Sequence, residues 1–171
     1  MINLHVINKK EFFPIILILI LALSRLIPHP PNFTPVVSVA IMSGYLFKNI
    51  YLSFATLLVS MILADAFIGF YENMLFVYLS LLLIAYFFYK IAEKINLKNL
   101  FFFSILGSVI FYLISNFGFW YFGNLYEKNF NGLMECYFLA IPFFKNTVLS
   151  TVVFTYAALI ADHFYKKKMF N

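Results

Sequence analysis

Residues 49–68 read NIYLSFATLLVSMILADAFI, an apolar run in which Asp65 is the single charged residue. About 20 consecutive apolar residues are enough for a helix to cross the hydrocarbon core of a bilayer. The composition of the whole chain agrees with this interpretation, because 64% of its 171 residues are hydrophobic and its mean hydropathy is +0.91. We therefore expect an integral membrane protein rather than a soluble one.

Five further apolar segments lie on either side of this run. With it, they predict six transmembrane helices, over residues 12–27, 35–47, 49–68, 74–92, 100–117 and 143–162. The second is short for a full crossing, because a helix rises only about 1.5 Å per residue. No change of composition marks a linker. The expected fold class is all-α, a polytopic membrane protein in which residues 1–171 form a single domain.

The distribution of charge predicts the orientation of this bundle. Lysine and arginine in short loops favour the cytoplasmic side. If the N-terminus is cytoplasmic, nine of the twelve basic residues and three of the seven acidic residues fall on that side. The cytoplasmic segments then carry a net charge of +6 and the outer segments −1. We therefore expect both termini in the cytoplasm, and the basic balance indicates the lipid bilayer as a partner, not nucleic acid.

One alternative concerns the start of the chain. Lys9 and Lys10, the apolar residues 15–23 and the small residues Ala22 and Ser24 also resemble a signal peptide. Cleavage there would leave five spans and an N-terminus on the outside. We favour an uncleaved first span, because the chain continues directly into a turn that is rich in motifs.

That turn, Arg25-Leu-Ile-Pro-His-Pro-Pro-Asn-Phe-Thr-Pro35, joins the first two spans. Its prolines exclude a helix, because proline fixes φ and has no backbone N–H. Irregular backbone at membrane depth is tolerated only against protein or a wet cavity. We expect a stiff extended turn that places His29 and Asn32 at the outer end of the bundle.

Arg25 and Asp65 lie at comparable depths near the outer ends of the first and third spans. An ionisable residue in this position is costly unless it is paired or hydrated. Two interpretations stay open, and they are not exclusive. The two residues form a structural ion pair that locks the outer rim, or one or both contact a solute.

The longest outer segment, residues 115–137, interleaves aromatic residues with amides and glycines. Anchoring at the membrane interface accounts for most of these aromatics. Asn116 differs, because an amide that closes an apolar helix needs a hydrogen-bond partner. Pro142 is expected to open the last span, which places Asn146 in its first turn.

These segments predict a lidded pocket that is open to the outside, since small-molecule sites are mostly apolar cavities with a few convergent polar groups. We expect Trp120 to stack on a planar group of the solute and the amides to form hydrogen bonds with it. The predicted binding residues are Arg25, His29, Asn32, Asp65, Asn116, Trp120, Tyr137 and Asn146.

Catalytic residues, metal ligands and cofactors are not predicted. The sequence contains no Gly-rich phosphate loop, no His-Glu-x-x-His and no Gly-x-Ser-x-Gly. Its single cysteine, Cys136, forms no Cys-x-x-Cys pair. We therefore expect a protein that is not an enzyme.

Two resemblances to known families follow from these motifs. Residues 12–72 resemble the front half of the substrate-capture (S) components of energy-coupling factor vitamin transporters, through Arg25-Leu-Ile-Pro, Asn32-Phe-Thr-Pro, Val39-Ala-Ile-Met-Ser-Gly-Tyr-Leu-Phe and Ser60-Met-Ile-Leu-Ala-Asp-Ala-Phe-Ile-Gly. Nearly the whole chain is also similar to an uncharacterised family of small bacterial membrane proteins, through Arg-x-x-Pro-His-Pro-Pro-Asn-Phe at 25–33, Asn116-Phe-Gly-x-Trp120, Gly132-Leu-x-x-Cys-Tyr137 and Ile141-Pro-Phe-Phe-x-Asn-Thr147.

The S-component resemblance implies a six-helix protein of the bacterial inner membrane with both termini in the cytoplasm. It also implies a site near the outer surface, closed by the loop after the first helix, and an ATP-driven coupling module as a partner. The first span departs from the family, because Ala22 is the only alanine in residues 12–23, where S components carry an alanine-containing docking patch. A solitary form therefore stays open.

The favoured hypothesis is an S-component-like protein that captures a small vitamin-like solute at the outer face and supports its uptake. The alternative from another class is a non-transporting scaffold or assembly subunit whose outer motifs only cap the bundle. An intramembrane enzyme that uses Asp65, Glu72 or His29 is the least favoured, because no acid/base pair stands beside a nucleophile.

Overall fold

The computed structural model describes residues 9–170, with side chains for residues 11–168. Residues 1–8 and 171 of the predicted domain, and the side chains of Lys9 and Lys10, lie outside the described part. The described chain contains six α-helices and no strand, which confirms the all-α class with six helices. The helices are α1 (Lys9–Leu23), α2 (Val36–Leu46), α3 (Ile50–Ile68), α4 (Met74–Lys90), α5 (Leu100–Phe122) and α6 (Phe130–Phe170), with short 3₁₀ helices η1 (Ser24–Leu26) and η2 (Ala92–Lys94).

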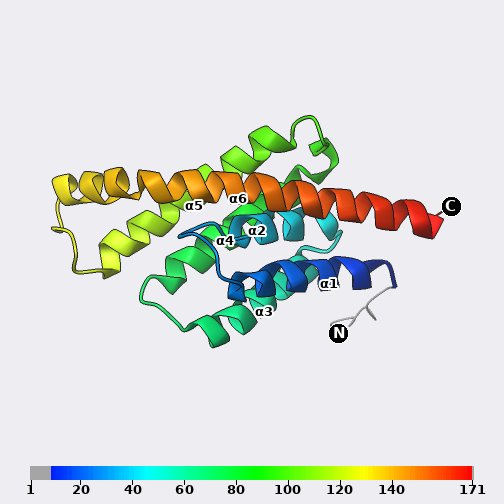
Figure 1. Ribbon diagram of the computed structural model, residues 1–171, viewed down its shortest axis with the longest axis horizontal. Helices are drawn as coiled ribbons and strands as arrows, with labels where there is room; N and C mark the ends of the chain where they lie inside the picture. The colour runs from blue at the N-terminus through cyan, green and yellow to red at the C-terminus, as the bar shows by residue number, and fades with distance from the viewer. Residues whose placement is uncertain (1–8, 171) are drawn as a thin grey trace.

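Helix α2 lies at the centre of the bundle and contacts all five other α-helices (Figure 1). Nine consecutive residues, Val36–Gly44, are buried. With 11 residues, the helix is about 16 Å long at a rise of ~1.5 Å per residue. That is roughly half the thickness of a bilayer core. Helix α2 is therefore surrounded by the other helices. Because it is short, space remains within the bundle beyond its first residue.

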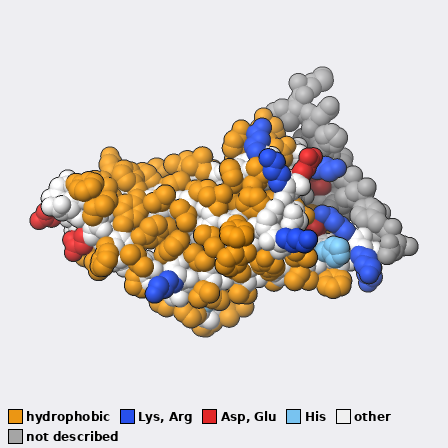
Figure 2. Space-filling model, turned by 90° about the horizontal axis from the view of Figure 1, so that it is seen from above, with side chains coloured by type: hydrophobic (Ala, Val, Ile, Leu, Met, Phe, Trp, Pro, Cys, Tyr) orange, Lys and Arg blue, Asp and Glu red, His pale blue; other side chains and the backbone are white. Residues whose placement is uncertain are grey.

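The two ends of the bundle differ in charge. At one end, named here the Asp65 end, lie residues 27–35, 69–73 and 123–129. At the other, the Lys98 end, lie residues 47–49 and 91–99 together with the last turns of α6. Figure 2 shows acidic side chains at the tip of the Asp65 end and most of the visible Lys and Arg side chains toward the Lys98 end. The described chain begins and ends at the Lys98 end (Figure 1).

The outer surface of this bundle is apolar, unlike that of a water-soluble protein, and so is much of its interior. Hydrophobic side chains cover much of the face that Figure 2 shows between the two ends, and exposed large hydrophobic residues occur on the five α-helices other than α2. Within the described residues, three helices are long and apolar enough to cross a membrane, namely α3, α5 and residues 130–168 of α6. These features indicate a membrane protein. The fully buried side chains include small hydroxyl residues from five of the helices: Ser38, Ser53, Ser60, Ser80, Ser104, Ser108, Ser150, Thr151 and Thr155.

Small side chains of this kind let helices approach closely. In the described chain, all of these hydroxyls except that of Ser104 donate to a backbone carbonyl or to another hydroxyl. Ser38 Oγ donates to the backbone oxygen of Thr151 at 3.0 Å, and Thr155 Oγ1 donates to Ser38 Oγ at 3.0 Å. These two hydrogen bonds join α2 to α6 through the middle of the bundle.

Helix α2 approaches the backbone of α4 closely at Gly44. A Cβ atom at Gly44 would overlap the carbonyl oxygen of Ala85 and lie 2.8 Å from the amide nitrogen of Tyr89. At Gly107 of α5, in contrast, a Cβ atom would meet the end of a flexible side chain, at 2.9 Å from Ile41 Cδ1. Only glycine therefore permits the observed spacing between α2 and α4.

The structure corrects the expected start of the last helix. Pro142 does not open this helix, because α6 begins at Phe130 and Pro142 lies within it. Asn129 explains the earlier start, since its Oδ1 accepts a hydrogen bond from the Gly132 N–H at 2.9 Å and so caps the helix. The expected outer segment, residues 115–137, consists largely of the end of α5 and the first turns of α6, joined by residues 123–129.

We predict that Gly44→Ala destabilises the bundle more than Gly107→Ala does. Overpacking costs about 1–3 kcal/mol, and the α4 backbone cannot yield without moving the helix, whereas the Ile41 side chain can rotate. Both changes have the same helix propensity, so the second is a matched control. Apparent melting temperatures in mild detergent measure the difference. Equal stability of the two variants would contradict the close contact between α2 and α4.

Candidate functional site

Two adjoining cavities occupy the space beyond the first residue of α2, at the Asp65 end. The larger has a volume of about 330 Å³ and the smaller about 170 Å³. They share four lining residues, Asn32, Val77, Phe111 and Thr147. Val36 and Val37, the first residues of α2, line the smaller cavity. The short central helix therefore ends where the cavities begin.

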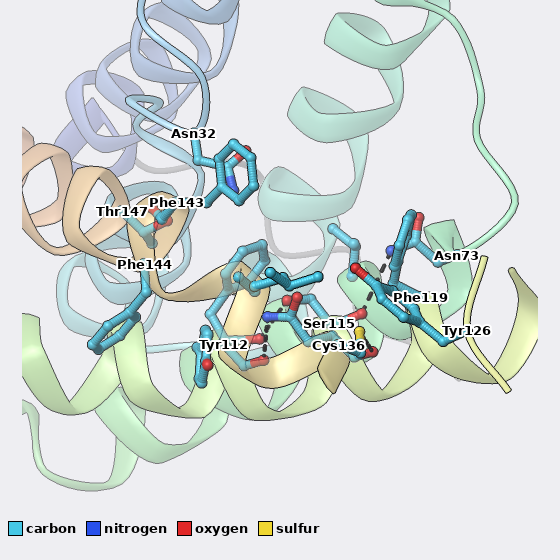
Figure 3. Close-up of a pocket in the computed structure, with 15 residues that line it drawn as sticks. Asn32, Asn73, Tyr112, Ser115, Phe119, Tyr126, Cys136, Phe143, Phe144 and Thr147 are labelled. Carbon is cyan, nitrogen blue, oxygen red and sulfur yellow. Dashed lines mark hydrogen bonds between the residues drawn. The ribbon is translucent and has the colours of Figure 1, made fainter. Parts of the chain in front are cut away.

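The larger cavity is mostly apolar, with a few polar groups that come from four parts of the chain. Figure 3 shows Asn32 extending toward the cavity from residues 27–35, with Tyr112 and Ser115 of α5 across from it. This composition is typical of a site for a small molecule. The aromatic lining residues are Phe111, Tyr112, Phe119, Tyr126, Phe143 and Phe144, and the polar ones are Asn32, Asn73, Ser115, Asn116 and Thr147.

Several amide groups of this cavity keep hydrogen-bonding capacity. Asn116 uses its Nδ2 atom to donate to the backbone oxygen of Tyr112 at 2.8 Å, and Asn73 donates through Nδ2 to the backbone oxygen of Ser115 at 3.5 Å. The carbonyl oxygen of each amide remains as an acceptor. The larger cavity can therefore bind a solute that donates hydrogen bonds.

The backbone of residues 27–35 positions Asn32 over both cavities. Asn32 has a φ of 59°, in the left-handed region that asparagine tolerates better than most residues. The N–H of Phe33 donates to the oxygen of Pro30 at 2.9 Å and closes a tight turn around it. Asn146 Nδ2 on α6 donates to the oxygen of Pro31 at 2.8 Å. This segment thus contains an internal turn and is tied to α6 by one hydrogen bond, and it lines the cavities although residues 27–32 are exposed.

The predicted ion pair between Arg25 and Asp65 is confirmed. Arg25 Nη2 lies 2.8 Å from Asp65 Oδ1, and the hydroxyl of Tyr78 donates to Asp65 Oδ2 at 2.7 Å. The side chain of Asp65 is fully buried and that of Arg25 is 9% exposed. Both carboxylate oxygens of Asp65 thus have partners inside the protein, which favours a structural role for this residue.

Arg25 also faces the smaller cavity. It lines this cavity together with Tyr71, which lies between α3 and α4. Its Nε atom is buried and has no hydrogen-bond partner in the part of the chain that the structure describes. Buried donors are rarely left unpaired, so water or an acceptor group of a solute in the cavity would satisfy this atom.

Tyr71 adds a neutral hydroxyl to the same wall. Burial, and after it the negative charge of Asp65, raises the pKa of Tyr71 to about 12. The phenol therefore stays protonated at physiological pH, and it can donate a hydrogen bond into the cavity without adding charge.

Five of the eight predicted binding residues line neither cavity: Asp65, which lies behind Arg25, and four others. His29 is exposed, with Nδ1 2.9 Å from the oxygen of Pro30. Trp120 Nε1 donates to the oxygen of Glu127 at 2.9 Å, and the Lys128 ammonium lies 5.5 Å from the centre of a Trp120 ring. The Tyr137 hydroxyl donates to the oxygen of Leu113 at 2.6 Å. The fourth, Asn146, holds residues 27–35 as described above.

The structure thus brings Arg25, Asn32 and Asn116 to the cavities, with Asp65 behind Arg25. It adds polar residues that were not predicted, in particular Asn73, Tyr112, Ser115 and Thr147. Ser115 and Thr147 are direct neighbours of predicted residues, and one residue along a helix turns the side chain by about 100°. Among the described residues, no group of three His, Cys, Asp or Glu side chains could hold a metal ion.

A family model described as a family of unknown function (DUF6580) matches residues 6–170. The chain belongs to this family. The match fits the expected similarity to an uncharacterised family, and its description assigns no activity to DUF6580. No curated protein and no solved structure matches the chain.

We predict that Arg25→Met is strongly destabilising and that Arg25→Met/Asp65→Leu recovers much of the loss. Removing one partner of a buried ion pair leaves the other charge uncompensated and costs about 3–5 kcal/mol, whereas replacing both by apolar residues is often nearly neutral. The single variant Asp65→Leu should lose less than Arg25→Met, because a long arginine side chain can turn toward solvent.

Thermal unfolding of the three variants and the unmodified protein in mild detergent forms a double-mutant cycle. If the loss in the double variant equals the sum of the two single losses, the pair contributes no coupling, and the structural role of this pair is refuted.

Proposed function

We propose that this protein is a multi-pass protein of the bacterial inner membrane whose six helices form the transmembrane bundle, with both termini in the cytoplasm. The length and apolar character of α3, α5 and α6 support this arrangement. So does the excess of basic residues toward the Lys98 end, where the described chain begins and ends. In this arrangement, α2 lies in the centre of the bundle and is surrounded by the other helices. The Asp65 end faces the outside.

Single cysteine substitutions test this orientation. We expect Asn124→Cys, in the exposed segment 123–129, to react with a membrane-impermeant maleimide on intact cells. Lys98→Cys, which is also exposed, should react only after the cells are permeabilised. The unmodified protein is the control, because its single cysteine, Cys136, is buried and should stay unlabelled. Labelling of the Lys98 position on intact cells would refute the orientation.

We further propose that the two cavities capture a small vitamin-like solute from the outside, and that the protein supports the uptake of this solute. The observation that carries the proposal is the pair of adjoining cavities, lined by aromatic rings and by amides with free acceptor atoms. Asn32, Asn73 and Asn116 would bond to the solute. Phe119, rather than its neighbour Trp120, is placed to contact a planar group.

In this proposal, residues 27–35 cover the solute and the Arg25–Asp65 pair supports the rim. The buried Nε of Arg25 favours an acceptor group on the solute near the smaller cavity. The resemblance to S components extends the proposal to an ATP-driven coupling module on the cytoplasmic side. Because α1 exposes large apolar side chains such as Phe12 and Ile20 where S components carry alanines, a solitary form is the other version of the proposal.

A non-transporting scaffold or assembly subunit is the second candidate. It is favoured by the engagement of Trp120, Tyr137 and Asn146 in hydrogen bonds within the chain. In that function, the outer motifs hold the rim of the bundle together. Purification in mild detergent separates the two candidates. A bound solute supports capture, and a stoichiometric partner without a solute supports the scaffold.

We predict that Asn116→Ala weakens solute binding about tenfold. A lost hydrogen bond to a buried polar group costs about 1–3 kcal/mol, and 1.4 kcal/mol corresponds to a factor of ten in affinity. The solute is first identified by mass spectrometry of the gently purified protein, and its affinity for the variants is then measured by titration.

Asn124→Ala is the matched control, because Asn124 is an exposed amide at the same end and lines neither cavity. It should leave the affinity unchanged. Equal affinities of Asn116→Ala, Asn32→Ala and the unmodified protein would show that the solute does not bind in these cavities.

A further inference from the structure

A third cavity lies at the Lys98 end of the bundle, opposite the proposed solute site. It has a volume of about 860 Å³ and is bounded by the end of α2, the segment between η2 and α5, and the last turns of α6. Its lining includes Tyr45, Leu97, Lys98, Asp162, Phe164 and Lys166. None of these residues has a role in the proposed capture of a solute.

The charged side chains that line this third cavity, named here the cleft, have a net positive charge. Lys166 Nζ lies 2.6 Å from Asp162 Oδ2, so these two charges compensate each other. The side chain of Asp162 is 3% exposed, whereas that of Lys166 is 54% exposed. Lys98 forms no ion pair within the described residues. The cleft therefore offers an unpaired cation at Lys98 and the accessible face of a second ammonium group at Lys166.

The Lys166 side chain is held in place on the wall of the cleft. Besides its pair with Asp162, its ammonium group lies 5.7 Å from the centre of the Tyr45 ring. The segment that carries Lys98 is fixed as well. Asn96 Oδ1 accepts hydrogen bonds from the N–H groups of Lys98 and Asn99, and the Tyr156 hydroxyl of α6 donates to the oxygen of Leu97. Both cations are thus attached to ordered parts of the chain.

Apolar side chains lie directly beside these cations. Leu97 is 52% exposed and Phe164 65% exposed, and both line the cleft. A free phosphate ion would bind the ammonium groups but leave this apolar surface uncovered. A phospholipid provides both chemistries in one molecule, since its phosphate lies next to its acyl chains. Basic pockets between membrane helices on the cytoplasmic side are suited to anionic headgroups.

We propose that this cleft binds an anionic phospholipid of the cytoplasmic leaflet. The phosphate contacts Lys98 and Lys166, and the first part of the acyl chains lies against Leu97 and Phe164. This proposal rests on the membrane orientation given above and not on the presence of a solute in the other two cavities. Failure to bind a solute would leave it unaffected.

The test uses the full chain, purified in mild detergent and supplied with equal amounts of phosphatidylglycerol and phosphatidylethanolamine. Native mass spectrometry measures how much of each lipid remains bound. We expect phosphatidylglycerol to be retained preferentially. Lys98→Gln should lower its retention about fivefold, since a cation near an anionic lipid contributes about 1 kcal/mol.

Lys90→Gln is the matched control, because Lys90 is an exposed lysine at the same end that does not line the cleft. It should leave the retention of phosphatidylglycerol unchanged. Lys166→Gln removes one partner of Asp162 and can disturb folding, so Leu97→Ser serves as the second test variant, and it should weaken lipid retention through the apolar wall.

A parallel titration with inorganic phosphate distinguishes the two sources of phosphate. Retention of the lipid in millimolar phosphate supports the proposal. Displacement of the lipid by phosphate, together with no effect of Leu97→Ser, would show a site for a soluble anion and overturn the proposal. Equal loss of lipid in Lys98→Gln and Lys90→Gln, or no preference between the two lipids, would overturn it as well.

Discussion

The contact between α2 and the backbone of α4 determines how the rest of the molecule is arranged. Because Gly44 lets the two helices touch, α2 can lie in the centre with protein on every side. A helix in that position does not need to match the thickness of a bilayer. The space that a longer helix would fill is divided between residues 27–35 and the two cavities at the Asp65 end. The central position of α2 and the two cavities beyond its first residue therefore both follow from the shortness of this helix.

Much of this arrangement could be predicted from the sequence. The apolar run at 49–68 corresponds to α3 (Ile50–Ile68), and the prolines of residues 27–35 correctly exclude a helix there. The pairing of Arg25 with Asp65 was also predictable, because two opposite charges at equal depth in an apolar environment have few other partners. The start of α6 was not, because a proline favours the first turn of a helix, whereas this helix accommodates Pro142 in its interior and is capped by Asn129.

The rotational position of the polar residues could not be derived from the pattern of the helices. In a soluble protein, an apolar stripe shows which side of a helix faces inward. Here both the interior and the outer surface are apolar, so the pattern does not distinguish Asn146 from Thr147, of which only Thr147 lines the cavities. Small hydroxyl residues such as Ser38 and Ser104 are the better signal, because they gather in the interior where large side chains cannot fit.

Pro142 has a mechanical consequence. It removes one N–H from the hydrogen-bond ladder of α6, so the carbonyl four residues earlier loses its usual partner and the helix bends most easily at this point. Leu139 and Ala140 on one side of the proline, and Phe143 and Phe144 on the other, all line the larger cavity. A small hinge motion of the part of α6 before Pro142 would thus change the width of the larger cavity. The hydroxyl contacts that join the part after Pro142 to α2 would stay in place.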